Sequence, residues 1–311
     1  MMLFLFFMYF SSLSEKLKQN IKTLLLVGAI IIGFTFHEFF AQFNKVTPVF
    51  LFFMLFFAFC SVNLNEVRIR KEYFFLIIYQ VGVSIGVYFL VKQYDEILAQ
   101  GVMICILAPT AVAAVVMSSM LGANVISVIS YSLLINLVIS IVAPVYFSIM
   151  ETPEQFPFWI SVKNIIFKVF PLLLLPMILA ILIKKISLQF SEKLKKISGI
   201  SFYIWIISAT IVMGNTMKFI LVQDSKNNLT LLLLILASLV LCIFQFIFGY
   251  YIGKKYKDEL ACTQYMGQKN TILAIWMAQT FLNPISSIAP AAYVLWQNFV
   301  NTFQLWKNGK K

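Results

Sequence analysis

Long apolar runs, separated by short polar or charged segments, make up most of the chain. A helix needs about 20 mostly apolar residues to cross the roughly 30 Å hydrocarbon layer of a bilayer. Divided at charged residues and at Pro, Gly and Asn, the runs predict ten such helices and an all-α integral membrane protein. The predicted spans are residues 21–43, 47–64, 73–92, 98–120, 124–149, 160–183, 199–217, 229–252, 259–281 and 285–306.

The charges between the runs predict the orientation of the spans. Most of the 24 Lys and Arg residues fall on alternate connections, whereas the other connections carry acidic residues such as Asp95, Glu151 and Asp224. Short connections rich in Lys and Arg stay in the cytoplasm. Both termini are therefore expected to be cytoplasmic, which requires an even number of spans.

Ten spans divide into two repeats of five, and an odd number in each repeat gives the repeats opposite topology. The predicted parts are an N-terminal cytoplasmic or interfacial segment (1–20), a first repeat (21–149), an outer loop (150–159), a second repeat (160–306) and a cytoplasmic tail (307–311). Residues 1–10 are apolar but too short to span. They are either an interfacial anchor or an upstream extension.

The fourth span of each repeat is interrupted in its middle. Residues 108–111 (APTA) interrupt the first, and residues 265–271 (YMGQKNT) interrupt the second. Proline removes a backbone donor, and polar sequence at mid-membrane depth is tolerated only where it faces protein or water. Broken helices at matching positions of two repeats indicate a transport site. The alternative is two unrelated kinks.

Composition narrows the function further. The chain is 61% apolar and 12% charged, with a mean hydropathy of +0.91, so little of it is left for a soluble domain. The net charge of +12 lies in the connections and indicates topology, not nucleic-acid binding. No enzyme motif is present, so we expect neither an enzyme nor a cofactor. Buried free thiols, not disulfides or metal ligands, are expected at Cys60, Cys105, Cys242 and Cys262.

Lys269 is the charged side chain that the predicted spans place near the middle of a membrane. A cation there costs roughly 2.5 to 3.5 kcal/mol, and no carboxylate is expected at the same depth. We therefore expect its partner to be a helix C-terminus, carbonyl oxygens or a bound anion, unless it loses its proton. A snorkelling lysine without a function is the alternative.

Small and polar residues around the two breaks form the predicted transport site. Helix N-termini at a break present unpaired N–H groups and a positive dipole end, which suit a carboxylate or sulfonate. Taken singly, each Ser or Thr is more often a helix-packing residue, and only their meeting at two breaks indicates a site. The predicted site residues are Lys269, Asn270, Thr271, Gln268, Thr110, Ala111, Val112 and Ser118.

The residues around the second break also carry a resemblance to a known family. Residues 265–271, 290–293 and 296–298 resemble the ninth and tenth helices of the bile acid:sodium symporter family. Residues 108–118 and 54–64 are similar to matching family segments, so the resemblance covers nearly the whole chain. It implies ten helices, a panel domain, and a core domain in which the two broken helices cross. It also implies transport of bile acids or smaller organic anions with sodium.

The sequence departs from the family pattern at the sodium ligands. Tyr265 stands where the family has a Glu that coordinates both sodium ions, and Lys269 stands where it has a sodium-ligating Gln. Ala114 and Val115 replace a Ser-Asn pair that helps to bind sodium. A site without a carboxylate and with an added cation is poor for sodium, and the Lys269 ammonium would occupy about the place of a sodium ion.

Other residues match the family or are polar at a suitable depth. Gln80 matches a sodium-site Gln, and Asn270 matches the Asn at the helix crossing, while Ser132 and Asn136 align only by assumption. As buried amides, Gln80 and Asn136 are alternatively plain interhelical hydrogen-bonding residues. The residues considered for a coupling ion or a polar core are Gln80, Tyr265, Gln264, Ser132 and Asn136.

The function predicted from sequence is transport of a small organic anion by alternating access, without sodium at the usual site. The protein would be a facilitator, or a proton-coupled carrier in which Lys269 loses its proton in the empty site and regains it with the anion. Alternatives are a sodium-coupled symporter with rearranged ligands and a non-transporting membrane sensor or partner subunit. The residue usage suggests a bacterial inner membrane, and membrane lipid is the expected surrounding; the sequence does not indicate an oligomeric state.

Overall fold

The structure is a computed structural model that describes residues 24–25, 28–62, 66–111, 113–150, 157–222 and 228–308. These residues are helical except for short turns and one isolated pair of bridged residues. Residues 28–35 form a helical stretch near the beginning of the described chain. The elements that follow are α3 (His37–Ala41), η1 (Asn44–Val46), α4 (Thr47–Cys60), α5 (Lys71–Val91), α6 (Glu96–Leu107), α7 (Ala113–Met120), α8 (Val125–Met150), α9 (Phe158–Ile186), α10 (Leu188–Lys196), α11 (Ile200–Val222), α12 (Asn228–Tyr256), α13 (Glu259–Gly267), α14 (Thr271–Phe281), η4 (Pro284–Ser287) and α15 (Ile288–Asn308).

Five helices, α5, α8, α9, α11 and α12, are long and apolar enough to cross a membrane. Large apolar side chains lie exposed on them, among them Ile78, Phe167 and Val240. A surface of this kind is favourable where hydrocarbon surrounds the helices. The predicted all-α class is therefore confirmed for the described residues, and the helices support a membrane protein. That all ten predicted spans cross a membrane stays a prediction.

The two interrupted spans are each divided into two helices. Span 98–120 contains α6 and α7, and span 259–281 contains α13 and α14. The helix α10 was not predicted, because a search for long apolar runs overlooks a short helix with several lysines. Residues 1–20 (anchor or extension), most of the outer loop 150–159 and the end of the C-terminal tail lie outside the described residues.

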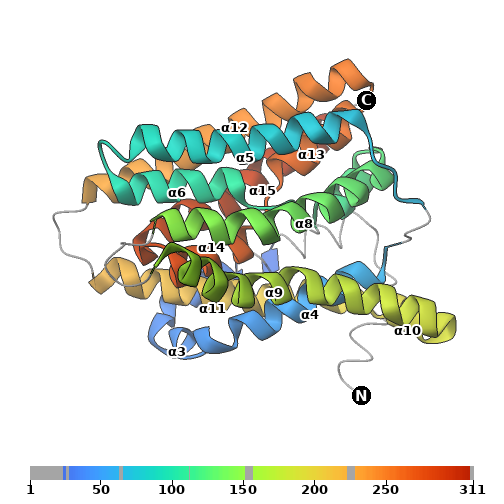
Figure 1. The fold of residues 1–311 in the computed structure, drawn as a ribbon, viewed down its shortest axis with the longest axis horizontal. Coiled ribbons are helices and arrows are strands. Elements are labelled where there is room, and N and C mark those ends of the chain that lie inside the picture. The colour runs from blue at the N-terminus through green and yellow to red at the C-terminus, as the bar shows by residue number, and fades with distance from the viewer. Residues whose placement is uncertain are drawn as a thin grey trace.

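The helices form two sides of a bundle (Figure 1). On one side, α9 and α11 both pack against α4, with α3 against α11 and α10 against α9. On the opposite side α5 packs on α6, and α12 packs on α13, α6 and α15. Helices α8 and α14 lie between the two sides in this view. The helices next to the two breaks are therefore mostly covered by other helices.

Helix α13 lies very close to α12 because two glycines of α12 face it. A Cβ atom placed on Gly249 would come within 2.4 Å of the Cys262 carbonyl oxygen, and one on Gly253 within 2.7 Å of the Glu259 Cα. Small residues let helix backbones approach in this way inside a membrane. The close contact fixes the depth of α13 and therefore the position of the break at its end.

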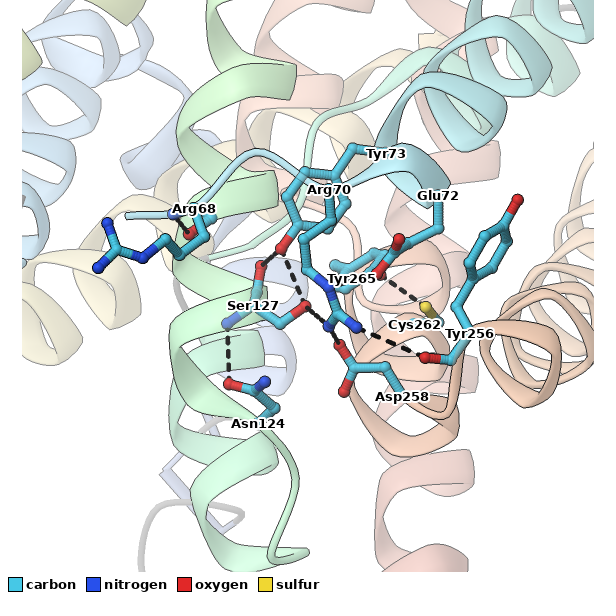
Figure 2. Close-up of polar contacts among 11 residues, drawn as sticks. Arg68, Arg70, Glu72, Tyr73, Asn124, Ser127, Tyr256, Asp258, Cys262 and Tyr265 are labelled. Atoms are coloured by element: carbon cyan, nitrogen blue, oxygen red, sulfur yellow. Dashed lines mark hydrogen bonds and ion pairs between the residues drawn. The ribbon is translucent and has the colours of Figure 1, made fainter. Parts of the chain in front are cut away.

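A cluster of charged and polar side chains joins the beginnings of α5, α8 and α13 (Figure 2). Arg70 pairs with Glu72 at 2.7 Å and with Asp258, the residue that precedes α13. Its guanidinium also donates to Ser127 Oγ on α8 at 3.3 Å, and the Tyr73 hydroxyl contacts the same Ser127 oxygen at 2.9 Å. The cluster thus holds the first turn of α13 against two other helices.

Both carboxylates of this cluster are buried, whereas the Arg70 side chain is 30% exposed. Burial lowers the pKa of the Arg70 guanidinium, but the neighbouring charges of Asp258 and Glu72 outweigh burial and raise this pKa above its ordinary value. Arg70 therefore stays charged at every physiological pH. A buried carboxylate that loses its cation is strongly destabilising.

We expect Gly249→Ala to lower stability, because the new methyl group would meet the α13 backbone. Overpacking of this kind costs about 1–3 kcal/mol. Gly82→Ala in α5 is the matched control: its Cβ meets nothing within 4 Å, so it should leave stability unchanged or raise it by up to about 1 kcal/mol. The measurement is Tm in detergent, and equal values for the two variants would contradict the close contact.

We expect Arg70→Gln to lower stability by about 2 kcal/mol, less than the ~3–5 kcal/mol of a fully buried pair because Arg70 is partly exposed. Arg70→Lys should be intermediate, since it keeps the charge and loses the forked geometry. Arg68→Gln, at an exposed position two residues away, is the control. If the two glutamine variants lost the same stability in denaturation experiments, the cluster would not be a structural joint.

Candidate functional site

The two breaks lie directly against each other. Thr110 and Lys269 form an isolated antiparallel bridge. Beside it, the Ala111 N–H donates to the Gln268 carbonyl at 2.9 Å, and the Asn270 N–H donates to the Pro109 carbonyl at 2.7 Å. Backbone groups released at a break must find partners, because none come from the hydrocarbon. Each broken helix therefore supplies the hydrogen-bond partners of the other.

Local sequence explains why both helices stop here. Ala108 precedes proline and adopts an extended ψ of 133°, as residues before proline do. Gln268 is also extended, with φ −95° and ψ 95°, and Asn270 then begins α14 by accepting from the Leu273 N–H through its side chain. An asparagine N-cap is among the strongest start signals of a helix. The chain can thus end one helix and begin another within a few residues.

Lys269 lies at this crossing and is 1% exposed. Its ammonium Nζ donates to the Ile106 carbonyl at 3.0 Å, one residue before the end of α6. Its backbone N–H donates to the Gln297 side chain of α15 at 2.9 Å. The last carbonyls of a helix carry partial negative charge and favour a cation. The structure therefore places this lysine against a helix C-terminus, one of the partners considered from sequence.

Gln80 caps the same end of α6. Its side-chain NH₂ donates to the carbonyls of Leu107 and Ala108 at 2.9 and 2.8 Å, and its oxygen accepts from the Tyr131 hydroxyl at 3.1 Å. The side chain is fully buried. Both donors and the oxygen of this amide are engaged by the protein itself. In this arrangement Gln80 is a helix cap and not a free ligand for a cation.

Tyr265 occupies the space beside Gln80 with an aromatic ring. The ring stacks on Tyr131 at a centroid distance of 4.3 Å and meets the edge of Tyr73 at 5.9 Å. Its hydroxyl lies 2.6 Å from the Cys262 sulfur (Figure 2). The three packed tyrosines fill this part of the core with carbon atoms, which are not ligands for a metal ion. Among the described residues no cluster of three His, Cys, Asp or Glu side chains is placed to hold a metal.

The end of α13 is capped from the other break and from α15. The Thr110 hydroxyl donates to the Tyr265 carbonyl at 2.7 Å, and the Tyr293 hydroxyl of α15 donates to the Gly267 carbonyl at 2.8 Å. Tyr293 in turn accepts from Gln245 of α12 at 3.2 Å. The ends of α6 and α13 therefore both receive side-chain donors, as buried helix ends require.

A cavity of about 430 Å³ lies on one side of the crossing. Its walls are mainly apolar and come from α4, α7, α8 and α11, with Met54, Phe59, Leu133, Phe202 and Trp205 among them. No charged residue lines it among those that the structure describes. The size and apolar walls are typical of a pocket for a small organic molecule.

The crossing contributes the polar wall of this cavity. Ala111, Gln268 and Asn270 line it, together with Ser132 of α8 and Asn298 of α15. Within the described residues, Gln268 Oε1 and Asn270 Nδ2 have no hydrogen-bond partner, although each side chain is only 3% exposed. A buried amide without a partner costs free energy, which a ligand that hydrogen-bonds it recovers.

The other predicted site residues do not line the cavity. Lys269 and Thr110 lie within the crossing, and Thr271 is buried in the first turn of α14. Ser118 is buried on α7, and Val112 lies outside the described residues.

The residues considered for a coupling ion are dispersed in the same way. Gln264 donates to Gln304 of α15 at 2.7 Å, away from the crossing. Asn136 donates to the Ser132 carbonyl one turn earlier on α8. Gln80 and Tyr265 occupy the capped, aromatic region described above, and Ser132 alone of the five reaches the cavity.

Sequence reasoning missed several residues that build the crossing. Tyr131 looked like an ordinary apolar position in a span, and Gln245 was not distinguished from other amides. Tyr293 and Gln297 entered only as part of the family resemblance, without a role at the crossing. Their signal is a hydroxyl or amide in the middle of an apolar run, because such groups need partners in lipid. Which backbone carbonyl each one meets depends on the packing of helices far apart in sequence.

Comparison with known proteins identifies the family. No curated protein matches the chain. The model of the SBF-like CPA transporter family matches residues 67–300, which include both broken helices and the crossing. The match confirms the resemblance to bile acid:sodium symporters seen in the sequence. Since it covers more than half of the 311 residues, the chain belongs to the SBF-like CPA transporter family.

Proposed function

We propose that this protein carries a small organic anion by alternating access and does not bind sodium where the residues of related symporters do. The observation that carries the proposal is the position of Lys269, whose buried ammonium holds the end of α6 at the helix crossing. A fixed cation at that place supplies the positive charge that a bound sodium ion would otherwise bring. The alternating motion then needs no metal ion to complete the crossing.

The neighbours of Lys269 support the absence of a sodium site. Sodium is best held by several oxygen ligands with a carboxylate among them, whereas Tyr265 brings a ring to that position. The Gln80 side chain is occupied by two carbonyls and the Tyr131 hydroxyl. Binding a metal ion there would require these hydrogen bonds to break and two stacked rings to part.

The cavity is the proposed binding site of the anion. Asn270 Nδ2 offers a free donor, and α7 and α14 begin at the crossing, so their positive dipole ends lie near the polar wall. The apolar walls suit a substrate with a hydrocarbon or ring body. Lys269 is not a lining residue, so we propose that it acts on the anion through the field at the crossing and not by direct contact.

The proposed arrangement has ten spans in two inverted repeats of five. Helices α4, α9 and α11 would form the panel, and the helices around the crossing would form the moving core. The cavity lies at the end of α4 and the beginning of α11, where the basic α10 is also found. With basic connections in the cytoplasm, as a bacterial inner membrane protein with cytoplasmic termini would have them, the cavity would open to the cytoplasm.

We expect Lys269→Gln to reduce uptake of anions into proteoliposomes about ten-fold or more, because the Ile106 carbonyl loses its partner and the crossing loses its charge. Lys168→Gln, at an exposed position on α9, is the matched control. The probes are a panel of carboxylates and sulfonates, first screened by the rise in Tm that each one causes.

Uptake by the unchanged protein should be the same in sodium and potassium buffers. Sodium-dependent uptake, or full activity of Lys269→Gln, would contradict the role given to the lysine. Saturable uptake supports a carrier, whereas ligand stabilisation without any flux would support a sensor on the same fold.

We expect Gln268→Glu to weaken anion binding about 1,000-fold, measured as a loss of ligand-induced Tm shift. The change puts a negative charge into the cavity, and a like charge about 4 Å away costs about 4 kcal/mol at an effective dielectric constant of 20. Gln268→Met, similar in size and uncharged, should lose much less. The comparison is made at mildly alkaline pH so that the glutamate is ionised, and unchanged binding by the Glu variant would place the anion elsewhere.

A further inference from the structure

The short helix α10 carries a dense group of exposed lysines. Lys193, Lys195 and Lys196 lie in its last turn, Lys185 lies just before it, and all four are exposed. Glu192 is the one acidic residue between positions 184 and 196. Lysines in the last turn of a helix interact favourably with the negative end of its dipole, but each interaction contributes only about 0.3–1 kcal/mol. The group as a whole is a strong local excess of positive charge.

Large apolar side chains lie exposed beside these lysines. Ile186 is 82% exposed, Leu188 64%, Phe190 50% and Ile197 52%. On the other side of the helix Ser191 is buried and Leu194 is half-buried, so α10 rests on the protein by that side. Apolar and basic side chains together on the free side of a helix are typical of a helix that lies in the interface of a membrane.

The position of α10 brings this surface next to the cavity. The helix packs on α9 and α4 and projects at one end of the bundle (Figure 1). Ser198 and Gly199, which follow it directly, line the cavity beside the crossing. A small second cavity between α10 and α4 is lined by Ser191 and Cys60. A molecule bound to α10 would therefore lie next to the mouth of the cavity.

Another basic segment at the end of α12 differs in its surroundings. Lys254, Lys255 and Lys257 are followed at once by Asp258 and Glu259. The Lys255 ammonium also lies over the rings of Phe75 and Tyr256, at 6.0 and 5.8 Å from their centroids. This segment has two adjacent acids and aromatic partners for Lys255, whereas among the described residues the α10 lysines have one acidic neighbour, Glu192, and no aromatic partner. It therefore serves as a natural comparison.

We propose that α10 is a binding surface for anionic phospholipid, in which Phe190 and its apolar neighbours enter the acyl region and the lysines bind the phosphate of the headgroup. Charge complementarity selects the lipid, because a lysine near an anionic membrane surface contributes about 1 kcal/mol. The adjacent apolar side chains select a lipid over a free ion, since they gain only from hydrocarbon. A lipid held here borders the cavity mouth and anchors the α4 and α9 side of the bundle.

The test compares the thermal stability of the purified full-length protein in neutral detergent with added phosphatidylglycerol, phosphatidylcholine or inorganic phosphate. The proposal expects a rise in Tm of several degrees with phosphatidylglycerol and little change with the other two. In the triple variant Lys193→Gln, Lys195→Gln and Lys196→Gln this rise should fall by at least half. The triple variant Lys254→Gln, Lys255→Gln and Lys257→Gln should keep it.

A third variant, with arginine at the three α10 lysines, distinguishes loss of charge from damage to the fold. It keeps the positive charge, so it should keep the rise in Tm with phosphatidylglycerol. An equal rise in both glutamine variants would overturn the proposal, as would an equal rise with phosphatidylcholine. An equal rise with inorganic phosphate would identify an ion site and not a lipid surface. None of these measurements depends on the transported substrate, so the result is independent of the proposed transport function.

Discussion

The crossing of two broken helices in an apolar interior is the constraint on which the rest of the structure depends. Each break releases carbonyl and N–H groups that water cannot reach. The extended segments around Thr110 and Lys269 pair with each other through backbone hydrogen bonds. The remaining carbonyls at the helix ends accept hydrogen bonds from side chains of other segments. Gln80, Tyr293 and the Lys269 ammonium each bind a carbonyl near a helix end. The first role of the polar residues in this core is therefore to hydrogen-bond the backbone groups that the two breaks leave unpaired.

The same arrangement gives the site its chemistry. The Lys269 ammonium donates to the Ile106 carbonyl, so a side chain of the protein already occupies the end of α6. The packed rings of Tyr265, Tyr131 and Tyr73 fill the neighbouring space with carbon atoms. On the other side of the crossing, Gln268 and Asn270 remain with unused hydrogen-bonding atoms next to an apolar cavity. The capped helix ends and the proposed ligand site thus lie on different sides of one junction.

Contacts far from the crossing also fix its position. Arg70 and Asp258 hold the beginning of α13, and Gly249 sets how closely α13 approaches α12. A helix fixed at its start and along its side delivers its broken end to a defined position. The α4 and α11 side has a different character, since it borders the cavity and carries the basic α10. Firm attachment of α13 on one side, and on the other a basic helix that we propose to bind lipid, are compatible with the relative movement of the proposed carrier.

The sequence alone determined the membrane class, the two breaks and the isolated charge, because hydropathy, proline and a lysine in an apolar run act through local chain properties. It also indicated the family, since residues 265–271 carry a distinctive order. It did not reveal that Tyr131 donates to Gln80, that the Lys269 ammonium binds the Ile106 carbonyl, or that Asp258 pairs with Arg70. Those facts depend on which helices meet. Only tertiary packing decides which of many buried polar groups serves a neighbouring backbone and which remains free for a ligand.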